Sequence, residues 1–549
     1  MRVFLRNFFI KYIYFSFRLL VKRTIKNKVV MPHKVIDEIY EIFDNVNKNQ
    51  VFQKKIIVPY EDITELNRIN IYRPYEILEA KTVLKKSQLD LNIETTKEFI
   101  LPLAILDLNS SEKGNDHIKL SYNKVEVDLE LKYKNRFHYL PIKSDNYCEK
   151  IQIESDRRDI AIGKPIYKDK KPLEAKPKLI VHIFVDAFTQ CIVDQFGYEI
   201  IPNTRNFFSN GGTFYTNAYA QSEWTLSSIA GVFTGKYTNE HLLYHPRRED
   251  KIKETTIADV LSEEGYRTFS CTNVPRLTAV NGFDKGFDRS IVALDKDYNY
   301  IINEACEQLD AFGGNQYQFL GFFDLHEAHR LQPVSSQSIN NIKDFNFKHY
   351  PRGSKDTSIV FDEEQINMYK NSITHFDKKI QRLYDAINSY DKEAMVILHS
   401  DHGVSFMGKT TELLAQEREK IVFLYKNNKE SKIDNNIKEI RELPSMICRD
   451  LKIKDSFNHK YEGYAITESI YPNKEYEIVV RDKISALFFK ISWEDLIKRN
   501  TEDYQYSSSY HPLDNETLLL KEDDNYKKSI LIAKNHYLTM CKTISVKGL

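Results

Sequence analysis

Hydrophobic positions follow different patterns in successive parts of the chain, and the first clear pattern lies between residues 46 and 175. Apolar and polar residues alternate with a period of two at 118–122 and again at 125–133. Such alternation predicts half-buried strands. We therefore predict a β-rich, sandwich-like accessory domain over 46–175, which ends in a Lys- and Pro-rich linker at 164–178.

A second pattern begins near residue 176. Residues 179–185 are a nearly unbroken apolar run that ends at Asp186, and 395–398 form a similar run shortly before Asp401. Unbroken apolar strands are typical of parallel sheets covered on both faces. Strand-like and helix-like segments alternate over 176–430, which predicts a doubly wound, mostly parallel α/β sheet. Ligands of such sheets bind at the carboxyl ends of the strands, so both aspartates are expected on the functional rim.

The two ends of the chain differ from both patterns. Residues 1–45 are basic and aromatic, and charges interrupt every apolar stretch before the ~18 residues that a membrane-spanning helix needs. This segment suits a helix in a membrane interface or, equally, a helix packed on the following domain, and it carries no signal-peptide cleavage pattern. We interpret 431–549, with a strand pair near 477–480 and 486–489, as an α+β completion of the catalytic domain.

Composition narrows the functional class. The formal net charge is +1 and the mean hydropathy is −0.50, which excludes a polytopic membrane protein and a chain-wide nucleic-acid footprint. The 34 Tyr and 32 Phe residues exclude a disordered chain. None of the six cysteines forms a Cys-x-x-Cys pair, so we predict reduced cysteines in a cytoplasmic protein, with peripheral contact at the inner membrane face through residues 1–45.

Four clusters carry candidate chemistry: Asp186, the segment 222–235 with Thr225 at the start of an expected helix, the segment 324–329 with two histidines, and Asp401-His402-Gly403. Carboxylates and imidazoles at strand ends can bind one cation, which activates a hydroxyl as a nucleophile. A helix N-terminus beside them favours an anionic phosphate or sulfate group. Each cluster taken alone also fits a helix cap, a turn or a solvated loop.

In their order along the chain these clusters resemble the alkaline phosphatase superfamily, specifically its sulfatase-like branch. The resemblance covers about 178–430. It includes the segment 201–220, which is similar to the family's Pro-Asn to Asn-Ala-Tyr stretch, and Thr234-Gly235, from which the nucleophile position falls on Thr225. Further motifs that resemble family markers lie at 265–268, 286–288 and 326–330. The resemblance implies an alkaline-phosphatase-like fold.

The nucleophile position departs from the sulfatases within this resemblance. Sulfatases oxidise a Cys or Ser to formylglycine there, and Thr225 cannot form that aldehyde. A threonine nucleophile is instead similar to the phosphoethanolamine and phosphoglycerol transferases. The Gly-Lys-Trp-His segment of sulfatases is replaced by 272–275. A histidine that some transferases carry after Asp-His-Gly is missing, so the resemblance implies one divalent metal ion (Zn, Mn or Ca), and a second ion stays open.

The resemblance implies roles for individual residues. The metal ligands would be Asp186, Thr225, Asp401 and His402. Thr225 would attack phosphorus and form a phosphothreonine intermediate, while His329, or His326 in second place, would bind the substrate oxyanion or protonate the leaving group. Substrate-binding residues would be Lys409, Trp224 and Asn217.

Three functions remain open at this stage. The first is a phosphoryl-ester transferase or hydrolase that acts on a glycan, a cell-surface polysaccharide precursor or a phospholipid-like substrate. The second is a sulfuric-ester hydrolase with unmodified Thr225, and the third is a non-catalytic glycan-binding or scaffold protein. The glycan substrate rests on analogy with the family. The sequence leaves the oligomeric state open.

Overall fold

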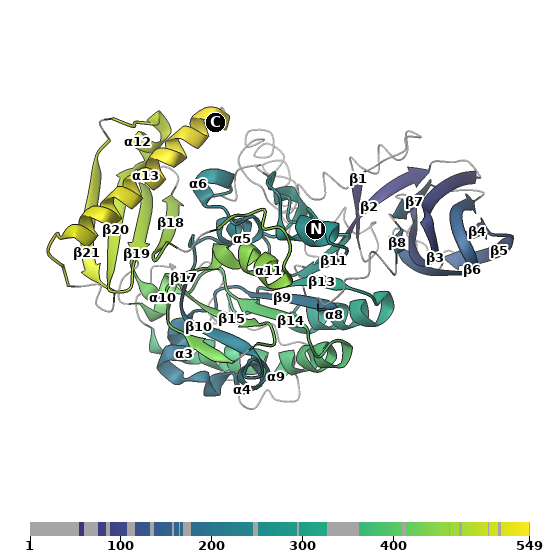
Figure 1. The fold of residues 1–549 in the computed structure, drawn as a ribbon, viewed down its shortest axis with the longest axis horizontal. Helices are drawn as coiled ribbons and strands as arrows, with labels where there is room; N and C mark the ends of the chain where they lie inside the picture. The colour runs from purple at the N-terminus through teal and green to yellow at the C-terminus, as the bar shows by residue number, and fades with distance from the viewer. Residues whose placement is uncertain are drawn as a thin grey trace, which may run out of the picture.

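The computed structural model shows three parts: a β-rich lobe, a central α/β domain and a C-terminal sheet packed beside it (Figure 1). The structure describes residues 54–59, 75–83, 88–106, 116–131, 137–155, 159–163, 165–167, 177–244, 251–293, 296–326, 362–408, 413–429, 431–459, 462–471, 475–502, 504–513 and 518–547. The prediction for residues 1–45 lies outside this range.

The central sheet is mostly parallel, as predicted. Strands β12, β11, β13, β9 and β14 lie side by side in this order and run parallel, and β15 and β10 then follow antiparallel to their neighbours. The strand bounds are β9 Leu179–Val185, β10 Gly212–Tyr219, β11 Arg267–Thr272, β12 Arg289–Val292, β13 Gln316–Phe322, β14 Met395–His399 and β15 Lys420–Lys426. Two short strands, β16 Lys432–Asp434 and β17 Lys438–Glu439, pair with β10 at the edge.

Helices cover both faces of this sheet, which explains why β9 and β14 have no polar face. On β9, Val181 and Ile183 join one core cluster, and Ile180 and Phe184 join the other. The first face carries α3 Gln190–Phe196, α4 Pro202–Phe208, α8 Tyr298–Phe312 and α9 Glu363–Tyr390, and the second carries α5 Thr225–Thr234, α7 Ile257–Glu263 and α11 Leu443–Leu451. The predicted doubly wound α/β architecture is therefore confirmed.

The β-rich region is also confirmed, and its strands pair antiparallel. They are β1 Lys54–Pro59, β2 Tyr75–Val83, β3 Gln88–Leu106, β4 Asp116–Tyr122, β5 Val125–Leu131, β6 His138–Glu154, β7 Asp159–Gly163 and β8 Ile166–Tyr167. The described strands form one continuous run of hydrogen-bonded pairs, with register shifts where β3 meets β6, rather than two separate sheets. The expected linker at 164–178 begins with strand β8, which pairs with β3.

This lobe is joined to the central sheet by backbone pairing. Strand β2 pairs antiparallel with β12, so the two sheets share an edge. Two buried arginines add to the junction: Arg289 donates to the hydroxyl of Tyr139 at 2.9 Å, and the Arg267 guanidinium donates to the backbone oxygen of Tyr167 at 2.7 Å. The lobe is thus fixed to the central sheet.

The C-terminal part holds a separate four-stranded antiparallel sheet. Its elements are β18 Ala465–Tyr471, β19 Glu475–Arg481, β20 Ser485–Ser492 and β21 Tyr506–Pro512, with α6 Thr238–His241, α10 Gln416–Glu419, α12 Trp493–Lys498 and α13 Asp524–Lys547 nearby in the fold. The predicted pair at 477–480 and 486–489 is the centre of this sheet. Among the described residues, none of the helices is long and apolar enough to cross a membrane.

Candidate metal centre and nucleophile

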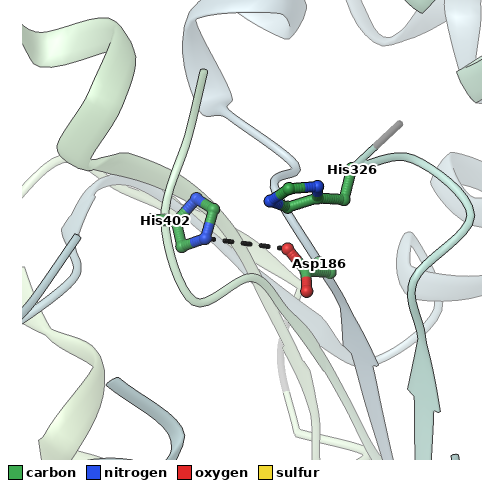
Figure 2. Close-up of side chains that lie close together, drawn as sticks. All are labelled: Asp186, His326 and His402. Atoms are coloured by element: carbon green, nitrogen blue, oxygen red, sulfur yellow. Dashed lines mark ion pairs between the residues drawn. The ribbon is translucent and has the colours of Figure 1, made fainter. Parts of the chain in front are cut away.

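Asp186 lies where β9 ends at the carboxyl edge of the sheet. Its backbone N–H still pairs with the sheet, donating to the Phe322 oxygen at 2.8 Å. The next residue, Ala187, leaves the strand with a positive φ of 59°. Figure 2 shows the Asp186 side chain pointing toward two imidazole rings. The strand therefore delivers a fully buried carboxylate to the predicted rim.

Asp401 and His402 follow β14, the neighbour of β9. Asp401 Oδ1 accepts hydrogen bonds from the backbone N–H groups of Ala187, at 3.1 Å, and His402, at 2.9 Å. The Ser400 hydroxyl lies 3.2 Å from the same oxygen. These contacts fix one oxygen of the carboxylate and leave Oδ2 to face His402 Nε2 at 3.3 Å.

The tautomer of His402 follows from its backbone contact. Nδ1 lies 2.9 Å from the Gly403 carbonyl oxygen, which only accepts hydrogen bonds, so Nδ1 carries the hydrogen. In the neutral ring, Nε2 then presents a lone pair. This nitrogen lies 3.7 Å from Asp186 Oδ1 (Figure 2). It lies 3.3 Å from Asp401 Oδ2. The lone pair of His402 Nε2 therefore lies close to carboxylate oxygens of both Asp186 and Asp401.

Thr225 is the first residue of α5 and its hydroxyl faces this group. Oγ1 lies 3.3 Å from His402 Nε2 and 3.4 Å from Asp186 Oδ2. Trp224 precedes the helix and gives no side-chain cap, so the helix start can attract an anion. The predicted nucleophile and three predicted ligands are therefore close together in the fold.

His326 extends the group from the loop after β13. Asp186, His326 and His402 each offer one ligand atom, and these atoms lie within 4.8 Å of one another. The ring stacks on Phe323, with centroids 4.8 Å apart. The resemblance implied a substrate role for His326, in second place after His329, and the geometry also allows His326 to bind the metal.

Asp324 and Asn273 support the turn that carries His326. Asn273 donates to Asp324 Oδ2 at 2.8 Å and accepts from the Phe323 N–H at 2.6 Å. Burial raises the pKa of Asp324 to about 7, which the hydrogen bond from Asn273 opposes. The segment at 272–275, which replaces a family motif, thus ties β11 to β13.

The donor set fits a divalent cation. Asp401 Oδ2 is buried and, within the part of the chain that the structure describes, receives no hydrogen bond. A buried carboxylate oxygen in this state is costly unless a cation or donor meets it. Carboxylate, imidazole and hydroxyl ligands suit Zn or Mn and do not exclude Ca.

Strand β18 of the C-terminal sheet holds the turn before the nucleophile. The Glu468 N–H donates to the Gln221 oxygen at 2.9 Å, and the Thr467 hydroxyl donates to the Ala220 oxygen at 2.7 Å. The Ser469 hydroxyl donates to Glu223, which forms a buried ion pair with Arg418. Sequence reasoning missed this support because no local pattern links residues this far apart.

The remaining predicted residues have different outcomes. His329 and Lys409 lie outside the described residues. Trp224 is 38% exposed beside Thr225, and its Nε1–H donates to the Ser469 hydroxyl at 3.3 Å. Asn217 donates to the backbone oxygen of Asn435 at 2.8 Å, so its amide is engaged at the edge of the sheet, away from the contacts of the metal group.

Comparisons with known proteins agree with this fold. A family model described as Sulfatase matches residues 178–432. A Bacteroides thetaiotaomicron structure, described in connection with the metabolism of multiple glycosaminoglycans, is 15% identical with a TM-score of 0.50, covering 67% of this chain and 97% of that chain. The phosphonate monoester hydrolase of Agrobacterium radiobacter is 13% identical with a TM-score of 0.48, covering 66% and 95%.

A search of the curated proteins finds no match. The first structural likeness supports the fold, and the family match spans the segment that carries Asp186, Thr225 and Asp401. Residues 178–432 therefore belong to the Sulfatase family, as the resemblance of the sequence predicted.

Proposed function

We propose that the chain is a metal-dependent enzyme that cleaves or transfers phosphate esters with Thr225 as its nucleophile. One observation carries the proposal: the Thr225 hydroxyl lies 3.3 Å from His402 Nε2 and 3.4 Å from Asp186 Oδ2, at the start of a helix. A hydroxyl beside metal-type ligands is the arrangement of an activated nucleophile. A threonine cannot become the sulfatase aldehyde, which favours phosphorus over sulfur as the centre attacked.

Asp186, Asp401, His402 and Thr225 would hold one divalent cation, with His326 placed to join them. When bound, such an ion lowers the pKa of a coordinated hydroxyl and neutralises developing negative charge. The fit rests on the buried Asp401 Oδ2 and on the lone pair that His402 Nε2 presents. The chain does not identify the ion, and a second ion stays open.

The chain's own residues then perform two displacements. Thr225 Oγ1 releases its proton to water and attacks phosphorus, so that an Oγ–P bond forms while the bond to the leaving oxygen breaks. That oxygen takes a proton from His329, which the sequence assigns to this role. Water or an acceptor hydroxyl next attacks phosphorus and the Oγ–P bond breaks, which makes the enzyme a hydrolase or a transferase.

The substrate class rests on the surface beside the nucleophile. Trp224 is part-exposed and its indole N–H is held by Ser469, so its ring can serve as a fixed platform for a sugar. We propose a phosphorylated glycan or a lipid-linked saccharide, with Lys409 as a further charged contact. Residues 1–45 would bring the enzyme to a membrane surface, on the cytoplasmic side.

Mass spectrometry of Thr225 tests the nucleophile. The protein would be incubated with Mn²⁺ and, separately, with an aryl phosphate monoester, an aryl phosphate diester and an aryl sulfate, then quenched in acid. We expect a phosphate adduct on Thr225 and turnover of a phosphate ester. Turnover of aryl sulfate alone would establish the sulfuric-ester alternative, and no turnover together with no bound metal would favour a scaffold.

Substitution of Trp224 by Ala tests the substrate class. We expect KM to rise for saccharide phosphates and to stay unchanged for a small aryl phosphate, because only the larger substrate reaches the ring. Trp493 on α12, the other of the two tryptophans in the chain, provides the matched control. Equal changes in KM for both substrates would count against a sugar platform.

A further inference from the structure

The turn after β9 contains a residue in a rare backbone conformation. Ala187 has a φ of 59°, in the left-handed region that costs free energy for any residue with a Cβ. Alanine has no polar side chain to offset that cost, as asparagine can. Strain of this kind persists only where surrounding contacts hold it. Ala187 directly follows the proposed ligand Asp186, so these contacts bear on the metal site.

The strained conformation directs backbone donors at the second ligand loop. The Ala187 N–H donates to Asp401 Oδ1 at 3.1 Å, and the Phe188 N–H donates to the Ser400 hydroxyl at 2.7 Å. Both acceptors belong to the loop after β14. If Ala187 relaxed to a negative φ, the chain beyond its Cα would turn and the Phe188 N–H would leave Ser400, whose hydroxyl lies 3.2 Å from Asp401 Oδ1.

One side chain outside the site holds this conformation in place. The Tyr369 hydroxyl donates to the Ala187 carbonyl oxygen at 2.5 Å and accepts from the Thr189 N–H at 3.2 Å. Tyr369 is fully buried on α9 and packs edge-on against Phe406, with ring centroids 5.5 Å apart. Burial raises the pKa of this phenol well above its usual range, so the hydroxyl keeps the proton that it donates.

We propose that Tyr369 is a positioning residue for the metal centre: it holds Ala187 at positive φ and thereby aligns Asp186 with Asp401. The proposal rests on the metal site proposed above. Tyr369 reaches the site only through the backbone of 187–189, as a residue in the second layer around a metal does. The Tyr369 hydroxyl stabilises the strained conformation of Ala187, which the turn would otherwise leave.

Metal affinity of matched tyrosine variants tests this proposal. Tyr384 lies on the same helix, is also fully buried, and its hydroxyl bonds Thr204 Oγ1 at 3.0 Å, remote from the site's contacts. Tyr369→Phe and Tyr384→Phe each remove one buried hydroxyl. By titration calorimetry with Mn²⁺ on the metal-free chain, we expect affinity to fall about 10- to 100-fold in Tyr369→Phe and to stay unchanged in Tyr384→Phe.

A glycine at position 187 supplies the second arm. Glycine adopts positive φ without the steric cost, so Ala187→Gly should bind Mn²⁺ like the wild type. In the double variant Tyr369→Phe/Ala187→Gly nothing drives the turn to relax, and we expect most of the lost affinity to return. The Mn²⁺ affinity of the double variant is compared with that of the wild type, so this experiment tests the proposal even if Tyr369→Phe alone does not fold.

The outcomes separate this inference from the proposed function. A wild-type chain that binds no Mn²⁺, Zn²⁺ or Ca²⁺ would refute the metal site itself. A wild-type chain that binds Mn²⁺ while Tyr369→Phe binds it equally well would overturn only the role of Tyr369. If the double variant bound Mn²⁺ as weakly as Tyr369→Phe does, the Tyr369 hydroxyl would not act by holding Ala187 in its strained conformation.

Discussion

The metal loops and the nucleophile turn meet at one point but are built differently. The loops that carry Asp186 and Asp401 grow out of adjacent strands of the central sheet, β9 and β14, and bond to each other. The turn before Thr225 is held instead by β18 from the separate C-terminal sheet. Because Thr225 is only one of the four proposed ligands, substitutions that loosen its turn should affect turnover more than metal binding.

Loss of the nucleophile should give the largest effect on turnover. In Thr225→Ala we expect kcat to fall by at least about a thousandfold, with Mn²⁺ binding lowered far less and thermal stability nearly unchanged. Thr234→Ala, at the other end of α5, removes a buried hydroxyl that bonds the Ala230 oxygen at 2.7 Å and should keep its activity. Full turnover of a phosphate ester by Thr225→Ala would refute the assigned nucleophile.

Loss of a metal ligand should weaken metal binding, which depends on the loops that carry Asp186 and Asp401. His402→Ala removes the lone pair that faces both carboxylates, so we expect Mn²⁺ affinity to fall more than about a hundredfold, beyond the usual effect of a second-layer residue. Calorimetry would measure this. His326→Ala sharpens the result: an equal loss would make His326 a ligand, and retained affinity with lowered kcat would assign it to the substrate.

Loosening the nucleophile turn from outside should lower kcat far more than it weakens metal binding. Glu223→Gln breaks the buried ion pair with Arg418. We expect kcat to fall about ten- to a hundredfold, because the Thr225 hydroxyl is no longer aligned for attack. Glu304, which pairs with Arg289 at 3.5 Å near the β-rich lobe, is likewise buried. Glu304→Gln should lose stability to a similar degree and keep kcat. A loss of Mn²⁺ affinity in Glu223→Gln as large as its loss of kcat would contradict this prediction.

The smallest expected effect is on the stability of the core below the two loops that carry Asp186 and Asp401. His182 Nε2 lies 2.6 Å from His399 Nε2, between β9 and β14. Burial lowers the pKa of His399 from 6.5 to about 4 and that of His182 well below its usual value. Both rings stay neutral when folded and bind protons when unfolded, so stability is full above pH 6.5 and falls as the pH drops toward 4.

Unfolding of the metal-free chain by urea at pH 7 and at pH 4.5 would measure this. His399 alone accounts for a loss of up to about 3 kcal/mol at the acid end. The double variant His182→Phe/His399→Phe should show a smaller loss over the same range. Identical pH profiles for wild type and the double variant would refute the prediction.

The sequence predicted what depends on local patterns. The apolar runs at 179–185 and 395–398 indicated central strands, and the acids after them indicated the rim, because the chain must bury both faces of such strands. The apolar stretch of small residues after Thr225 indicated a helix start, where α5 begins. The alternating pattern at 118–133 indicated β4 and β5.

What the sequence could not predict depends on contacts between distant segments. Tyr369 looks like one more aromatic residue on an amphipathic helix, and only the fold brings its hydroxyl to Ala187. The positive φ of Ala187 has no signal in its residue type, since alanine does not favour it. In the same way, Ser469 and Glu223 are polar residues 246 positions apart, and their contact follows from the docking of a separate sheet.

The pairing of β2 with β12 has a consequence for how this chain can be divided. A truncated chain that began near residue 176 would match the limits of the sulfatase domain, yet it would leave the backbone N–H and C=O groups of β12 without their partners on β2. Exposed strand edges recruit other chains and lead to aggregation. The lobe thus covers the open edge of the sheet at β12, and we expect soluble expression to need both parts together.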